Sequence, residues 1–180
     1  KTGDGGERWN AYSLDFNNYT NATFISENIG FAEHDSSVYM TKNGGLSWDV
    51  LLHEVLTDSI GDFDATSIVS SNENTFWTIV GDKYNDNTRI LRYTSDGDWE
   101  IIELGSGQEL HLFEIFFRDE NVGWITAEMF NGEYWETPLF KTEDGGESWN
   151  KINTPFLFSD MSFKDMQNGW AVGGDNMCHG

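Results

Sequence analysis

The chain has 180 residues, of which 38% are hydrophobic and 15% aromatic, so it can bury a core and does not belong with intrinsically disordered sequences. Its 10 Lys and Arg residues against 31 Asp and Glu residues give a formal net charge of −21, which disfavours nucleic acid and anionic membrane surfaces as partners. The single cysteine, Cys178, excludes an internal disulfide and a thiolate zinc site, and no apolar run of about 18 residues predicts membrane insertion. The length favours one domain over residues 1–180.

Four related strings recur along the chain. In order they are TGDGGERW at 2–9, TKNGGLSW at 41–48, TSDGDW at 94–99 and TEDGGESW at 142–149. Their first threonines are 39, 53 and 48 residues apart. We call these four strings the boxes. Such regular spacing indicates a tandem array of similar structural units.

A second string alternates with the boxes. It reads FISENIGF at 24–31, FRDENVGW at 117–124 and FKDMQNGW at 163–170, with a weaker copy at 69–76. The four starting positions are 45, 48 and 46 residues apart. Two interleaved motifs that keep one period predict four repeats over the whole chain.

Each repeat is expected to form a small antiparallel sheet. Short runs such as 76–80, 89–93, 124–129 and 138–141 are rich in aromatic and β-branched residues, and Gly, Asn and Asp separate them. Long helical patterns are absent from the sequence. A tandem unit of roughly 45 residues with about four short strands predicts an all-β fold, a β-propeller built of four-stranded antiparallel blades with about four blades present.

The boxes are expected to form the hairpin between the last two strands of a blade. Gly-Gly tolerates positive φ, and the Thr and Asp or Asn side chains can satisfy N–H groups of the turn. The Trp that ends each box is expected to enter the core. Asn43 can replace Asp in the second box, whereas the shorter box at 94–99 must use a different loop.

The box pattern S/T-x-D-x-G-x-x-W is similar to the Asp-box, or bacterial neuraminidase repeat. Together with the FxDxxxGW string, it makes the chain resemble the photosystem II assembly and stability factor family of propellers over essentially all 180 residues. The resemblance implies a structural role for the box residues Thr2, Asp4, Gly6, Trp9, Thr41, Asn43, Gly45, Trp48, Thr94, Asp96, Trp99, Thr142, Asp144, Gly146 and Trp149.

The resemblance also implies a ring of seven blades, which would need more than about 300 residues at ~45 residues per blade. Only four units are present. The ends are in phase, because the step from Thr142 through Gly180 to Thr2 is 180 − 142 + 2 = 40 residues. The expected arrangement is therefore part of a larger ring, with a closed four-bladed ring as the alternative.

Two classes of function are compatible with the sequence. The first is a non-enzymatic binding or assembly propeller that recognises a protein or a glycan, with Tyr134 and Trp135 as candidate ligand contacts. The alternative is a glycoside hydrolase of the sialidase or xyloglucanase type, with its site partly outside this chain. The four arginines, Arg8, Arg89, Arg92 and Arg118, are few for a sialidase, which binds its substrate carboxylate with arginines.

No cofactor or metal is expected. His34, beside Glu33 and Asp35, could begin a metal site, but a solvated surface triplet is the favoured interpretation, and His53, His111 and His179 lack partners at ligand spacing. The oxygen-rich stretches 58–64 and 81–87 do not match the spacing of an EF-hand, and Cys178 has no neighbouring base. The acidic composition favours a periplasmic, secreted or cell-surface location.

Overall fold

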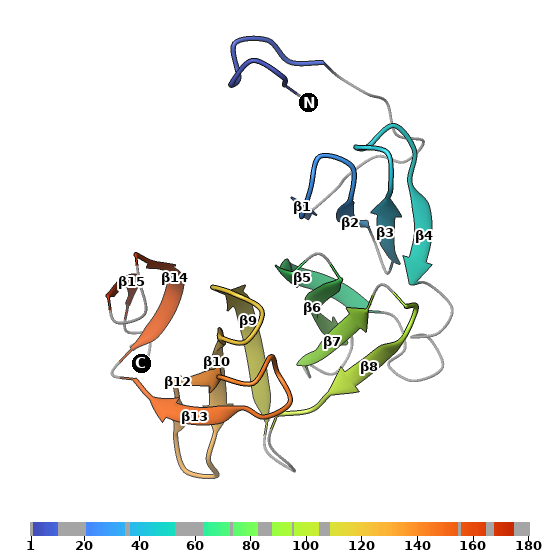
Figure 1. The fold of residues 1–180 in the computed structure, drawn as a ribbon. Helices are drawn as coiled ribbons and strands as arrows, with labels where there is room; N and C mark the ends of the chain where they lie inside the picture. The colour runs from blue at the N-terminus through green and yellow to red at the C-terminus, as the bar shows by residue number, and fades with distance from the viewer. Residues whose placement is uncertain are drawn as a thin grey trace.

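The computed structural model describes residues 2–10, 21–34, 37–52, 63–72, 74–82, 88–94, 96–104, 109–154, 156–164 and 168–174. These residues form strands and turns and no helix. Four antiparallel sheets follow one another in chain order, and we call them blades A to D. Figure 1 shows the blades side by side along an arc, with the N-terminal segment at one end and β14 and β15 at the other.

Blades A and B each have four strands in sequential order. Blade C adds the short strand β11, which pairs with β10, and blade D has two described strands. The strands of blade A are β1 (Asn21–Phe24), β2 (Gly30–His34), β3 (Ser37–Thr41) and β4 (Asp49–Leu52), and those of blade B are β5 (Phe63–Asn72), β6 (Thr75–Asp82), β7 (Thr88–Thr94) and β8 (Trp99–Ile102). Blade C contains β9 (Leu110–Phe117), β10 (Gly123–Phe130), β11 (Trp135–Glu136), β12 (Pro138–Thr142) and β13 (Asn150–Asn153), and blade D contains β14 (Leu157–Phe163) and β15 (Gly169–Gly174).

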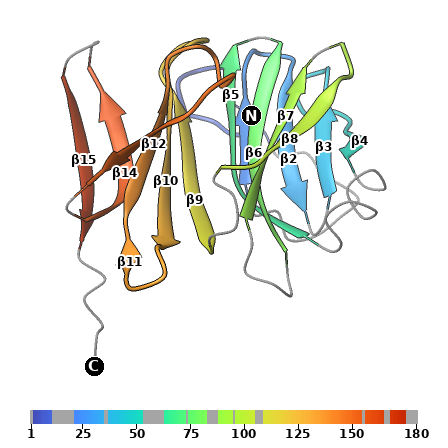
Figure 2. The same ribbon diagram turned by 90° about the horizontal axis from the view of Figure 1, so that it is seen from below.

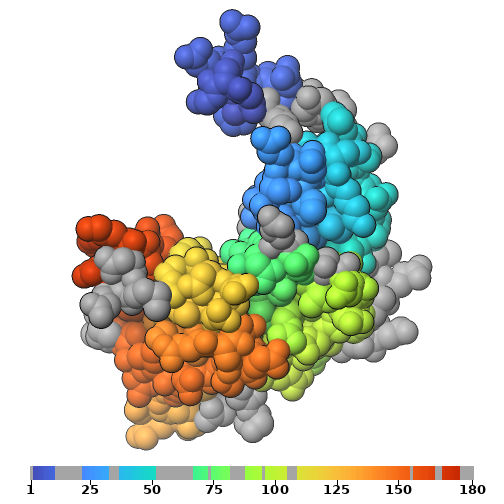
Figure 3. Space-filling view, viewed as in Figure 1, coloured from blue at the N-terminus to red at the C-terminus, as the bar shows by residue number. Residues whose placement is uncertain are grey.

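The four-stranded blades confirm the predicted all-β propeller class. The two predicted arrangements are part of a larger ring and a closed four-bladed ring, and the open arc of the described blades agrees with the first. Among the described residues, blade D pairs only within itself, and the box at 2–9 lies beyond blade A. The space-filling view in Figure 3 shows the same open arc, with the N-terminal segment projecting from its end.

The core lies between the blades. One cluster of buried side chains joins blades A and B, a second joins B and C, and a third joins C and D. Each of these interfaces contains a pair of stacked rings: Phe31 and Phe76, with centroids 4.3 Å apart, Trp77 and Phe117 at 4.9 Å, and Trp124 and Phe163 at 4.0 Å. An aromatic pair of this kind contributes about 0.5–1.5 kcal/mol beyond its area burial.

Within a blade, the second string places a Phe ring over a Gly. Phe117 covers Gly123, whose added Cβ would lie 2.8 Å from the ring, and Phe163 covers Gly169 in the same way at 2.6 Å. In blade B the equivalent cross-strand pair is Ser70 on β5 and Phe76 on β6, so the aromatic ring comes from the second strand of the blade and not from the first. The small and the aromatic residue have therefore exchanged strands in that blade.

The expectation that every box Trp enters the core is wrong for Trp9. Trp48, Trp99 and Trp149 are half-buried, and each packs at the edge of a blade. Trp9 is 72% exposed, because its box projects beyond blade A (Figure 1). Trp77, which does not belong to a box, is fully buried at the interface of blades B and C.

Candidate functional site

The box at 142–149 forms a compact turn between β12 and β13. Thr142 Oγ1 accepts a hydrogen bond from Gly146 N at 2.8 Å and donates one to Asp144 Oδ1 at 2.7 Å. Asp144 Oδ1 also accepts from Ser148 N at 2.9 Å. Hydrogen bonds from the Ser148 hydroxyl, the Ser148 backbone and Thr142 lower the pKa of Asp144 to about 2, so this carboxylate is ionised at neutral pH.

The second box uses the same bonds with an amide. Asn43 Oδ1 accepts from Thr41 Oγ1 at 3.0 Å and from Ser47 N at 2.9 Å, and Gly45 N donates to Thr41 Oγ1 at 2.9 Å. Asn43 Nδ2 adds a bond to Ser47 Oγ at 2.7 Å. The amide oxygen of Asn43 thus accepts the same two hydrogen bonds as the carboxylate oxygen of Asp144.

The shorter box at 94–99 forms a different turn, as the sequence predicts. Here Thr94 Oγ1 donates to the carbonyl of Asp98 at 3.3 Å, and Gly97 N donates to the carbonyl of Thr94 at 2.9 Å. Gly97, with φ of 96°, supplies the positive φ that this turn needs. Trp99 packs against the core cluster shared by blades A and B.

The boxes and the candidate ligand contacts Tyr134 and Trp135 lie at opposite ends of a blade. In blade C the box packs on the turn that joins β9 and β10, where Gly145 N donates to the carbonyl of Asn121 at 2.9 Å. Strand β11 follows the other end of β10, and Figure 2 shows it beyond the far end of the blade. The structure therefore does not bring the boxes together with the aromatic pair.

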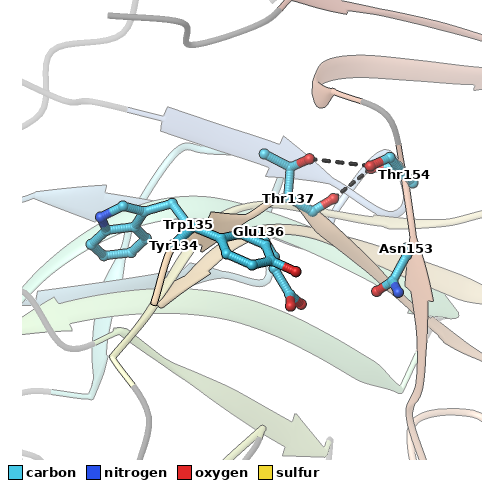
Figure 4. A pocket seen from close by; sticks show the side chains of 6 residues that line it. All are labelled: Tyr134, Trp135, Glu136, Thr137, Asn153 and Thr154. Carbon is cyan, nitrogen blue, oxygen red and sulfur yellow. Dashed lines mark hydrogen bonds between the residues drawn. The ribbon is translucent and has the colours of Figure 1, made fainter. Parts of the chain in front are cut away.

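Tyr134 and Trp135 line a surface pocket of about 310 Å³. The other lining residues are Glu136, Thr137, Asn153 and Thr154. Figure 4 shows the two rings on one side and the polar side chains of Asn153 and Thr154 on the other. Thr137 and Thr154 are linked to each other, since each hydroxyl donates to the backbone carbonyl of the other residue.

A tight turn positions the two rings. Asn131 Oδ1 accepts hydrogen bonds from Glu133 N and Tyr134 N, both at 3.0 Å, and Gly132 has a φ of 97°. The loop is therefore an Asx turn that needs glycine at its tip. Tyr134 is left 58% exposed and Trp135 38% exposed.

Trp135 is also held by its neighbours. Its ring centroid lies 5.1 Å from that of His111 and 5.6 Å from that of Phe130. One part of the indole is thus fixed against blade C while another part faces solvent. A ring fixed before binding loses little conformational entropy when a ligand arrives.

Glu136, in the wall of the pocket, forms an ion pair with Lys151. Lys151 Nζ donates to Glu136 Oε2, and Asn131 Nδ2 donates to Glu136 Oε1 at 2.7 Å. The hydrogen bond from Lys151, followed by that from Asn131, lowers the pKa of Glu136. An ionised carboxylate does not suit proton donation, which needs a raised pKa.

Among the carboxyl groups that the structure describes, Glu114 has a raised pKa, first because it is partly buried and second because of the charge of Asp160. It lies on β9 next to a β-bulge, where the register with β10 shifts between Thr126 and Ala127. Register shifts also occur between Ala65 and Ser67 in β5 and between Phe158 and Asp160 in β14. Glu114 and Asp160 thus occupy equivalent positions in neighbouring blades, and neither lines the aromatic pocket.

Sequence reasoning named the two rings but missed the residues that complete the pocket. Glu136, Asn153 and Thr154 come from β11, β13 and the segment after β13. Only the pairing of β10 with β11 and of β12 with β13 brings them together. No spacing in the sequence signals this set.

Several sequence candidates lie outside the described residues. They are Cys178, His53, His179 and most of the acidic stretches 58–64 and 81–87, and the side chain of His34 is likewise not described. Over the ranges that the structure describes, no three His, Cys, Asp or Glu side chains gather as metal ligands would. Within the same ranges no helix has the length and apolar character needed to cross a membrane.

The sequence matches no protein-family profile and no curated protein. Solved structures do resemble the fold. One is titled "YCF48 bound to D1 peptide", with a TM-score of 0.55 and 17% sequence identity over 83% of this chain and 48% of that one. Another is the GH74 enzyme of Niastella koreensis, with a TM-score of 0.55 and 17% identity over 77% of this chain and 23% of that one. The chain thus spans about half, or less, of these propeller proteins, and at this identity the likeness establishes the fold alone.

Proposed function

We propose that this chain is a non-enzymatic binding propeller and that Tyr134 and Trp135 contact its partner. The observation that carries the proposal is an exposed aromatic pair, fixed by an Asx turn and by two neighbouring rings, in a pocket whose wall also contains polar side chains. Aromatic side chains with one polar tip are the residues that binding surfaces favour, because each offers a large contact area at a low entropic cost.

The chemistry of the chain favours a protein partner with a basic segment. The formal net charge is −21, and Glu133 is exposed in the turn that adjoins the pocket, whereas the charge of Glu136 in the pocket wall is paired with Lys151. A peptide that carries an apolar or aromatic side chain next to Lys or Arg would match the rings and the charge together. The solved structure of YCF48 bound to a D1 peptide, which has a similar fold, supports a peptide as the ligand class.

A glycan is the second candidate ligand. Asn153 and Thr154 face the two rings across the pocket (Figure 4). An aromatic platform beside amide and hydroxyl groups is also suited to a sugar ring, which presents an apolar face and polar edges. A protein of this kind would act outside the cytoplasm, as its acidic composition suggests.

The test is a binding screen of the intact chain against basic peptides, acidic peptides and neutral oligosaccharides, followed by titration of the hits. We expect basic peptides to bind and Tyr134→Ala or Trp135→Ala to raise the dissociation constant by ~10-fold or more, as truncation of an anchor residue does. Val50→Ala is the control, because Val50 is also an exposed apolar residue, 56% exposed, but lies on β4 in blade A. Hits whose affinity is unchanged in both pocket variants would refute the pocket, and preferential binding of oligosaccharides would replace the peptide by a glycan.

The hydrolase alternative rests on Glu114. Its raised pKa is the property that a general acid requires, and Asp160 is a second carboxyl at the equivalent place in the next blade. Steady turnover of a fluorogenic glycoside that is lost in Glu114→Gln and kept in Tyr134→Ala would establish this alternative. It would also remove the non-enzymatic proposal.

A further inference from the structure

Strand β11 continues the line of β12 along the same side of β10. Met129 pairs with Glu136 in β11 and Thr126 pairs with Leu139 in β12, so one antiparallel register covers both strands. The far side of β12 is covered by β13, whereas β11 pairs with β10 alone among the described strands. The outer edge of β11 is therefore an open sheet edge within blade C, and the aromatic pocket lies beside it.

The backbone of Trp135 faces this open edge. Trp135 lies opposite Phe130, and Phe130 N donates to the carbonyl of Glu109 at 3.0 Å, on the β9 side of β10. In an antiparallel ladder the backbone groups of such a pair point away from each other, so the two residues form a non-hydrogen-bonded pair. The N–H and C=O of Trp135 consequently point away from β10, where no described strand pairs with them.

The chain that follows β13 turns aside before it reaches Trp135. Pairing of β12 with β13 extends to Asn153, and Thr137 and Thr154 are joined next by their hydroxyl and carbonyl groups. Continuing the same register would bring Phe156 opposite Trp135. Thr154 Oγ1 instead donates to the carbonyl of Phe156 at 2.9 Å, and the chain proceeds to β14 in blade D. The place beside Trp135 thus suits one further extended segment.

The charges around this edge favour a basic segment. Glu133 is exposed in the turn before β11, and the side chain of Glu109 is 54% exposed. Lys151 is close to the pocket, but its charge is paired with Glu136. With a net charge of −21 on the chain, an incoming strand that carries Lys or Arg has the complementary charge.

We propose that a basic peptide of a partner protein binds by adding a strand to the outer edge of β11, an inference that rests on the peptide-binding function proposed above. The peptide backbone would accept from the N–H of Trp135 and donate to its C=O, as in other cases of strand addition. Because side chains alternate between the two faces of a strand, successive peptide side chains would reach Tyr134 and Trp135. Backbone pairing supplies affinity, and the two rings supply selectivity.

Methylation of the peptide backbone tests the pairing. The probe is the capped peptide Ser-Lys-Phe-Lys-Phe-Ser, whose binding to the intact chain is followed by fluorescence anisotropy while each backbone nitrogen is methylated in turn. Loss of the nitrogen that donates to Trp135 should raise the dissociation constant by ~10-fold. The two flanking nitrogens point away from β11, so their methylation should change it by less than ~2-fold. The same peptide with Glu in place of Lys is the control for charge and should bind more weakly.

Amide hydrogen exchange locates the pairing on the protein. Saturating peptide should slow exchange of the Trp135 amide by ~10-fold or more, and the Glu136 amide, which faces β10, is the matched control that should not change. Tolerance of methylation at every nitrogen, or an unprotected Trp135 amide, would overturn strand addition. The peptide-binding function would still stand if Tyr134→Ala weakened binding.

Absence of binding by this peptide up to millimolar concentration would also overturn strand addition, because backbone pairing accepts most side chains. The proposed peptide-binding function would then fail only if no basic peptide of the wider screen bound to the chain.

Discussion

The boxes at 142–149 and 2–9 have nearly the same sequence and nearly the same internal hydrogen bonds. In the N-terminal box, Thr2 Oγ1 accepts from Gly6 N at 2.9 Å and donates to Asp4 Oδ1 at 2.8 Å, and Arg8 N donates to Asp4 Oδ1 at 3.0 Å. Gly5 and Gly6 have φ values of 72° and 95°, against 72° and 88° for Gly145 and Gly146.

Their surroundings differ completely. Thr142 is fully buried and Trp149 packs on Trp77 and Phe117 of the B–C interface. Trp9 is 72% exposed, and its indole N–H donates to the carbonyl of Gly6 within the box. The comparison shows that the eight-residue string suffices to specify the turn, whereas the neighbouring blade determines how much that turn contributes to stability.

The variants Gly146→Ala and Gly6→Ala are expected to show the largest difference in stability between the two boxes. A Cβ at Gly146 would lie 2.2 Å from Trp77, and alanine would also be strained at φ of 88°. We expect a loss of about 2–5 kcal/mol in the free energy of unfolding, the sum of left-handed backbone strain and overpacking. At Gly6 the nearest atom is 3.9 Å away, so only the backbone strain of about 1–2 kcal/mol remains, confined to the turn.

Denaturant unfolding followed by far-UV circular dichroism measures both variants. Equal losses for Gly146→Ala and Gly6→Ala would show that the turn itself, and not its packing on Trp77, dominates.

The same distinction explains how much of the molecule the sequence predicts. The period of the two strings, the β-rich runs between them and the Gly-Gly turns together predict the blade order and the box hairpins, because each depends on residues close in sequence. The different turn at 94–99 follows from the shorter length of that box, which has two residues fewer than the others. Burial of Trp9 was predicted wrongly, because a local string does not reveal whether a blade lies beside it.

Contacts between blades and across strands could not be predicted in the same way. In blade B, Ser70 takes the place of the Phe and Phe76 takes the place of the Gly, and Phe76 still stacks on Phe31. The weak string at 69–76 does not reveal this exchange. The pocket is similar. Tyr134 and Trp135 stand out by composition, while Lys151 reaches Glu136 only through the register of separate strands.

Replacing the box threonine by valine sharpens the comparison with a smaller change. Thr142→Val keeps the shape but removes the acceptor for Gly146 N and the donor to Asp144. Because Thr142 is fully buried, the orphaned N–H should cost about 1–3 kcal/mol of unfolding free energy. Thr2→Val leaves a turn that water reaches, and we expect a loss within ~0.5 kcal/mol. Thermal unfolding of the two variants checks this, and comparable losses would contradict it.

The smallest effect concerns the charge in the box at 142–149. The folded-state pKa of Asp144 is lowered to about 2 from the ordinary 3.8, so between about pH 4 and pH 2 the unfolded chain binds a proton that the folded chain does not. The contribution of this carboxylate to stability is thus present above pH 4 and is lost as the pH falls through about 2. Asp144→Asn should remove this dependence and still keep the turn, because Asn43 makes the equivalent bonds in the second box.

The difference in melting temperature between wild type and Asp144→Asn, followed from pH 7 to pH 2, isolates this one group among the many carboxylates of the chain. We expect the two curves to converge below pH 4. Curves that stay parallel through that range would mean that the Ser148 and Thr142 bonds do not hold the Asp144 carboxylate ionised.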